Sequence, residues 1–111
     1  MIDDKCEIVL NEQTYNGRLD MGAIANIQQE LQKIKKNITI PEIFNEVSNE
    51  NYSAINQIII QSITRCHPQL KEADILLNMK LKEKDDIVMS VLDLMKKALP
   101  IDEDKKKVTD M

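Results

Sequence analysis

The sequence predicts a mainly α-helical (α+β) fold in which an N-terminal β-hairpin packs on a bundle of about five helices. Apolar residues alternate with polar ones up to Leu19 and recur at helical spacing from Asp20 onward. The chain has 111 residues, of which 42% are hydrophobic and 31% charged, as expected for one globular domain. We assign this single domain to residues 1–99. The charged segment 100–111 is predicted to be a disordered C-terminal tail.

Two short alternating runs on either side of the polar pair Asn11-Glu12 predict the hairpin. In the first run, Cys6, Ile8 and Leu10 alternate with Glu7 and Val9; in the second, Tyr15, Gly17 and Leu19 alternate with Asn16 and Arg18. A two-stranded ribbon alone is only marginally stable in water, so one face is expected to pack on the helices. The turn lacks the Asn-Gly pair typical of tight hairpins, which leaves its geometry open.

The next three predicted elements are amphipathic helices. Asp20 is predicted to cap the first, which ends near Lys35 and Lys36. Its apolar positions are Ile24, Ile27, Leu31 and Ile34. The segment Thr39-Ile40-Pro41-Glu42 predicts a capping box at the start of a short second helix. The third helix is expected from about Tyr52 to Arg65, with Ile59 at the centre of its apolar face and Ile60 at the edge.

Two further helices are predicted in the last third of the domain. The fourth covers residues 71–83. Asp85 or Asp86 is expected to cap the fifth, and Pro100 is expected to close it. The apolar face of the fifth helix contains Ile87, Val88, Val91, Leu92, Leu94, Met95, Ala98 and Leu99.

The fourth and fifth helices have more apolar residues than one core stripe requires. Leu77 and Leu81 share one side of the fourth helix, whereas Ile75 and Met79 lie nearer its back. Met89 lies opposite the core face of the fifth helix. An exposed patch formed by Ile75, Met79 and Met89 would be a surface for a protein partner. These three residues are therefore the candidate partner-binding residues.

No group of residues in the sequence predicts catalysis, a cofactor or a metal. Cys6 and Cys66 belong to no Cys-x-x-Cys pair, and the single histidine, His67, directly follows Cys66. His67 is interpreted as part of the exit from the third helix. The neighbouring acids Asp85 and Asp86 would diverge on a helix, so they do not make an acid–base pair. We expect a non-enzymatic protein.

Composition also argues against two classes of partner. The net charge is −4 and aromatic residues are 3%, which disfavours nucleic-acid binding. The longest apolar run, Ile58-Ile59-Ile60, is far shorter than a membrane span, and the N-terminus lacks the pattern of a signal peptide. Two cysteines without an evident pairing suit a reducing compartment. We therefore expect a cytoplasmic protein with no nucleic-acid or membrane partner.

The segments Ile8-Val9-Leu10-Asn11 and Tyr15 to Ile24 resemble the small tail assembly chaperones of long-tailed phages and prophages, including the gene-transfer-agent type. Those proteins open with a short hairpin and continue through an arginine–apolar–acid step into a helix reading Gly-Ala-Ile. Here the step is Arg18-Leu19-Asp20, and the helix contains Gly22-Ala23-Ile24. The order of the later helices also fits, so the resemblance covers residues 6–99. The chain departs from the family at Lys35-Lys36-Asn37, where a glycine often ends the first long helix.

This resemblance implies a chaperone that binds the tape measure protein, helps to recruit the tail tube protein and is lost from the finished particle. A gene for such a chaperone is expected just upstream of a very long, helix-rich reading frame. A small helical regulatory or adaptor protein that binds another protein stays open as an alternative. A nucleic-acid-binding regulator is less favoured. Self-association into a homo-oligomer also stays open.

Overall fold

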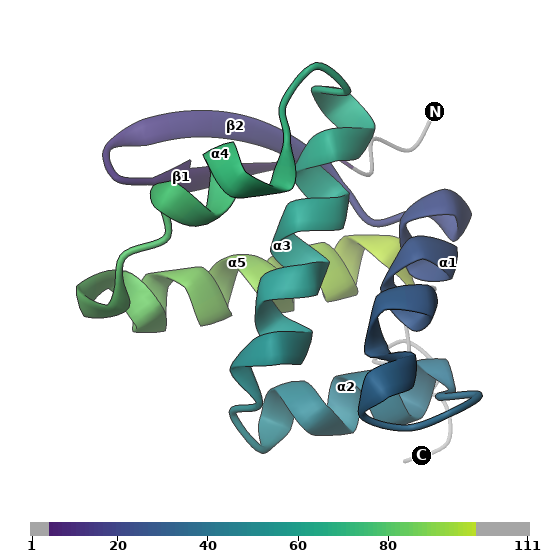
Figure 1. Ribbon diagram of the computed structural model, residues 1–111. Coiled ribbons are helices and arrows are strands. Elements are labelled where there is room, and N and C mark those ends of the chain that lie inside the picture. The colour runs from purple at the N-terminus through teal and green to yellow at the C-terminus, as the bar shows by residue number, and fades with distance from the viewer. Residues whose placement is uncertain (1–4, 100–111) are drawn as a thin grey trace, which may run out of the picture.

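The computed structural model describes residues 5–99, and the predicted tail with Pro100 lies outside this range. The hairpin consists of β1 (Lys5–Leu10) and β2 (Gln13–Arg18). The helices are α1 (Met21–Glu30), the 3-10 helix η1 (Leu31–Lys33), α2 (Ile40–Ser48), α3 (Tyr52–Cys66), α4 (Glu72–Leu77), the 3-10 helix η2 (Leu81–Glu83) and α5 (Lys84–Ala98). Figure 1 shows the hairpin at one end of a group of helices that surrounds α3. The predicted α+β class, a hairpin on a helical bundle, is confirmed.

The two strands pair antiparallel, with Ile8 opposite Tyr15 and Leu10 opposite Gln13. Burial alternates along β1 as predicted, because its even-numbered side chains face the helices. Asn11 and Glu12 form the two-residue turn, with φ angles of 52° and 67°. A two-residue hairpin turn matches the twist of its strands when both turn residues are left-handed. Asn11 and Glu12 therefore form this turn without a glycine.

Helix α3 is the central element of the domain. It contacts α1, α2, α4, α5 and β2, while β1 packs against α5 (Figure 1). Its buried apolar side chains are Ala54, Ile55, Ile58, Ile59, Ile60 and Ile63. The prediction that Ile60 lies at the edge of the apolar face is wrong, since only 1% of it is exposed. Packing of α1 and α4 on neighbouring sides of α3 buries a wider face than one amphipathic stripe.

Helix α1 is shorter than predicted. It gives way to η1, and Ile34 is 44% exposed, so the predicted apolar stripe ends one turn early. Asn37 then has a φ angle of 59°, a left-handed conformation that asparagine adopts more readily than most residues. This turn directs Ile38 into the core, where the Gln28 side-chain amide donates to its carbonyl oxygen at 2.8 Å. An asparagine thus makes the turn that follows α1 and η1.

The predicted N-terminal caps of α1 and α2 are confirmed. The Asp20 carboxylate accepts from the Ala23 backbone N–H at 3.0 Å. In the capping box, the Thr39 hydroxyl accepts from the Glu42 N–H at 3.3 Å, and the Glu42 carboxylate accepts from the Thr39 N–H at 2.9 Å. Glu42 also forms an ion pair with Lys35. The cap of α2 therefore also holds the end of the preceding loop.

Asp20 has a second partner, which the sequence analysis did not predict. Arg65, at the end of α3, donates from Nε to Oδ1 at 2.9 Å and from Nη2 to Oδ2 at 3.0 Å. Partial burial raises the pKa of Asp20, but the hydrogen bonds from Arg65 and from the Ala23 backbone outweigh it, so the pKa is lowered. A Cβ at Gly22 would lie 2.9 Å from Cζ of Arg65. Glycine thus leaves room for the guanidinium group.

Replacing Asp20 by alanine is expected to lower the free energy of unfolding by about 1–2 kcal/mol, because it removes both the helix cap and a half-exposed ion pair. Asp20→Asn retains a cap acceptor and should cost less. Since the pKa is lowered in the folded state, the stabilising effect of the charge is present above about pH 4 and lost as the pH falls below it. Denaturant unfolding at pH 7 and pH 3 measures both effects. If Asp20→Asn lowers the free energy of unfolding by the same amount at both pH values, the ion pair with Arg65 does not contribute to stability.

The predicted fourth helix over residues 71–83 is wrong. Helix α4 has six residues and ends before Asn78, and η2 forms a separate turn. Helix α5 then begins at Lys84 with Glu83 as its N-cap residue. Asp85 and Asp86 lie in its first turn, where they complement the helix dipole, so the prediction that one of them caps the helix is also wrong. The break between α4 and α5 forms part of the candidate site.

Candidate protein-binding groove

Large apolar side chains that the core does not bury gather on α4 and η2. The exposed ones in the described part of the chain are Val9, Met21, Ile34, Leu76, Leu77, Leu81, Met89 and Leu92. Leu77 and Leu81 are 74% and 77% exposed, and Leu76 is 39% exposed. Single exposed apolar residues are normal, but three leucines within six positions form a local concentration that points to a binding surface.

The break after α4 determines which apolar residues face outward. Ile75 is buried, with 1% of it exposed, and Met79 packs partly buried against the core. Leu77 and Leu81 lie on the side of the segment away from the core and are exposed. The sequence analysis had interpreted Ile75 and Met79 as the outward side, and the structure reverses this assignment.

The turn of the hairpin holds this break in place through polar contacts. The Asn11 backbone N–H donates to the Glu83 carboxylate at 3.1 Å, and the Asn11 side-chain amide donates to Oδ1 of Asn78 at 3.2 Å. The Asn78 amide in turn donates to the Tyr15 hydroxyl at 3.3 Å and to the Asp74 carbonyl oxygen at 3.2 Å. These contacts connect the first and last thirds of the domain. They fix the segment that carries the exposed leucines.

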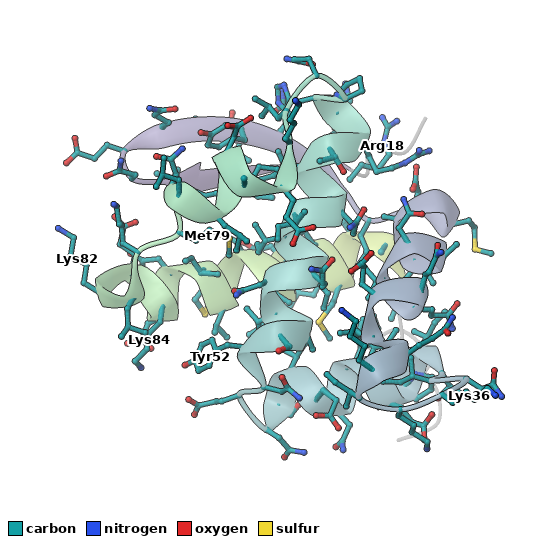
Figure 2. All side chains as sticks on the ribbon, in the orientation of Figure 1. Arg18, Lys36, Tyr52, Met79, Lys82 and Lys84 are labelled. Carbon is teal, nitrogen blue, oxygen red and sulfur yellow. The ribbon has the colours of Figure 1, made fainter. Side chains whose placement is uncertain are left out.

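A groove of roughly 150 Å³ lies beside this segment, and we call it the α4–η2 groove. It is lined by Tyr52, Asn56, Leu76, Met79, Lys80, Leu81, Lys84 and Ile87. Tyr52, Met79 and Lys84 lie on one side of the molecule in Figure 2. A second depression of roughly 330 Å³ shares Asn56 and Leu76 and extends to Leu31, Ile34 and Ile60. The two together follow the N-terminal part of α3, from Tyr52 to Ile60.

The charged residues that line the α4–η2 groove are both lysines, Lys80 and Lys84. Lys84 donates to the Asp85 carboxylate at 3.1 Å, and this hydrogen bond raises the pKa of Lys84, so the ammonium group is charged at neutral pH. Within residues 5–99, the side chains of Lys80 and Lys82 form no hydrogen bond or ion pair. Lys82 projects away from the body of the domain (Figure 2). Among the described residues, Lys80 therefore brings an unpaired positive charge to the groove, whereas Asp85 pairs with Lys84.

The predicted patch of Ile75, Met79 and Met89 does not exist as one exposed surface. Ile75 belongs to the core, and Met79 is a half-buried residue that lines the groove. Met89 is 57% exposed, as predicted, but it lies on α5 and does not line the groove. Met79 and Met89 stay predicted contacts for a partner, and Leu77 and Leu81 are the residues that the sequence analysis missed.

The histidine and the two cysteines, whose side chains could take part in chemistry, do not form a reactive site in the described part of the chain. Nε2 of His67 accepts from the Asn16 backbone N–H at 3.2 Å, and its ring meets Tyr15 edge to face. His67 is the C-cap residue of α3, which confirms its interpretation as the exit from that helix. Cys6 and Cys66 are not joined by a disulfide. Among residues 5–99, no three His, Cys, Asp or Glu side chains gather where they could hold a metal ion.

The comparisons with known proteins add no relative. Neither models of protein families, nor curated proteins, nor solved structures gave a match to the chain. Within the described range, none of the helices combines the length and apolar character needed to cross a membrane. The interpretation of the groove therefore depends on its own geometry and charge.

Proposed function

We propose that the protein is a non-enzymatic tail assembly chaperone of a phage or prophage, acting in the bacterial cytoplasm. In this role it binds the tape measure protein and helps to bring the tail tube protein to it. The observation that carries the proposal is the pair of exposed leucines, Leu77 and Leu81, beside the α4–η2 groove. The resemblance of the segment from Ile8 to Ile24 to such chaperones supplies the identity of the partner.

The physical requirement for such a chaperone supports this proposal. A protein that keeps long amphipathic helices soluble must cover their apolar faces with apolar surface of its own. The contacts of Asn11 with Asn78 and Glu83 hold the groove in shape within the isolated chain. A groove that is already formed loses less conformational entropy when a helix binds.

A helical adaptor that binds some other protein would use the same groove. The neighbouring genes separate the two functions. A very long, helix-rich reading frame just downstream supports the chaperone, and its absence favours the adaptor.

The co-expression of this protein with the product of that long reading frame tests the proposal. The partner should be soluble with the native protein, and its soluble fraction should fall several-fold with the double variant Leu77→Ser/Leu81→Ser. Both leucines are mostly exposed, so the free energy of unfolding of the variant should lie within about 0.5 kcal/mol of that of the native protein.

Val9→Thr is the matched control. Val9 is 52% exposed on the outer face of the hairpin, so this variant also removes exposed apolar surface, away from the groove. It should leave the partner soluble. A partner that stays soluble with the folded double variant would contradict the assignment of this groove. A partner that is insoluble with the native protein would contradict the chaperone function itself.

A further inference from the structure

We propose that the α4–η2 groove binds an amphipathic helix that carries Asp or Glu side chains beside its apolar face, an inference that rests on the proposed protein-binding function. The apolar lining of the groove suits an apolar side chain of a helix. Its sides are formed by α3 and the start of α5, and its apolar lining includes Leu76, Met79 and Ile87. Helices recognise such grooves through apolar side chains at three- and four-residue spacing.

The charge of the groove selects the acidic character of that helix. Lys80 and Lys84 line it, and no carboxylate does so within the described part of the chain. Lys82 lies next to the exposed Leu81, so three lysines occupy alternate positions around the apolar contact. The whole chain has a net charge of −4, whereas the two charged side chains that line the groove are both cationic. Carboxylates on the partner would complement them.

The nearby acids offset only part of this positive charge. Asp85 pairs with Lys84, whereas Glu83 accepts from the backbone of the hairpin turn. Asp86 lies in the first turn of α5 but outside the lining of the groove. Lys80 therefore has no acidic partner within residues 5–99. The second depression differs, because its charged lining residues are two acids, Glu30 and Glu72, and one lysine, Lys33. Acidic side chains on the partner thus complement the α4–η2 groove and not the second depression.

Two synthetic peptides of about three helical turns, the length of an average protein helix, provide the probes. They share one apolar face, and the flanking positions are Glu in one peptide and Lys in the other. Fluorescence anisotropy with the full chain should show that the acidic peptide binds about tenfold more tightly, because each exposed ion pair contributes up to about fivefold. The preference should decrease as the salt concentration rises.

The double variant Lys80→Glu/Lys84→Glu should abolish or reverse the preference for the acidic peptide. Lys36→Glu/Lys96→Glu changes the net charge equally at exposed positions outside the groove and should preserve the preference. Leu81→Ser should weaken binding of the acidic peptide several-fold without loss of the fold, since Leu81 is 77% exposed.

Equal binding of the two peptides to the native protein would overturn the inference. So would an acidic preference that survives the reversal of Lys80 and Lys84. A native protein that forms a dimer in sedimentation, and dissociates with Leu81→Ser, would show that a second copy occupies the groove instead. None of these outcomes decides the co-expression experiment, because a tape measure protein can bind without acidic flanks.

Discussion

Replacing Ile59 by alanine is expected to lower the free energy of unfolding by about 2–5 kcal/mol, through lost apolar burial and the cavity left behind. Ile60→Ala should cost a similar amount. Both side chains are buried, with 0% and 1% of their surface exposed, and both belong to the central helix. Denaturant unfolding with an unchanged m-value measures the two losses.

Leu77→Ala is the matched control for these core variants. It also replaces a large aliphatic residue by alanine on a helix. Because Leu77 is 74% exposed, the free energy of unfolding should change by no more than about 0.5 kcal/mol. A small loss at Ile60 together with a large one at Ile59 would contradict the burial of Ile60. A large loss at Leu77 would show that a further element or a second chain covers the surface around Leu77.

Replacing Gly17 by alanine is expected to lower the free energy of unfolding by about 1–3 kcal/mol, the usual effect of overpacking a core. A Cβ at this position would lie 2.5 Å from Cδ1 of Ile8 and 3.4 Å from Cβ of Ser62. The first distance is far below van der Waals contact, and the second is a tight one. Ile8 is fully buried between the hairpin and the helices, so its side chain has little room to move. Thermal or denaturant unfolding measures the loss.

A double-mutant cycle with Ile8→Val distinguishes this contact from a general weakening of the strand. Valine lacks the Cδ1 atom, and Ile8→Val alone should cost about 0.5–1.5 kcal/mol. In the double variant the clash is absent, so the total loss should be smaller than the sum of the single losses. Additive losses would show that Gly17 matters for a reason other than its contact with Ile8.

The sequence predicted those parts of the fold that depend on neighbouring residues. The alternation in β1, the cap at Asp20 and the capping box of Thr39 with Glu42 are all confirmed. Each depends on side chains within a few residues of one another, so local physical chemistry is sufficient to form it. The ends of α1 and α4 were predicted wrongly, because contacts from distant parts of the chain help to set them.

The candidate groove was only partly visible in the sequence. Leu77 with Leu81 and Ile75 with Met79 are both pairs at four-residue spacing, so periodicity alone could not decide which pair faces the core. The excess of apolar residues in this region was a correct signal that some would be exposed. The polar Asn78 in the middle of the predicted helix was the signal of a break, since asparagine is a weak helix former.

By itself, the sequence determined the class of the fold, the hairpin, the order of the helices and the caps of α1 and α2, because spacing and capping act over short distances along the chain. Only the tertiary structure decided that Ile75 is buried and that Leu77 and Leu81 are exposed. Asn11 lies 67 positions from Asn78, and Asp20 lies 45 positions from Arg65. No local pattern encodes such contacts, since they exist only once α3 has brought the hairpin and the last helices together.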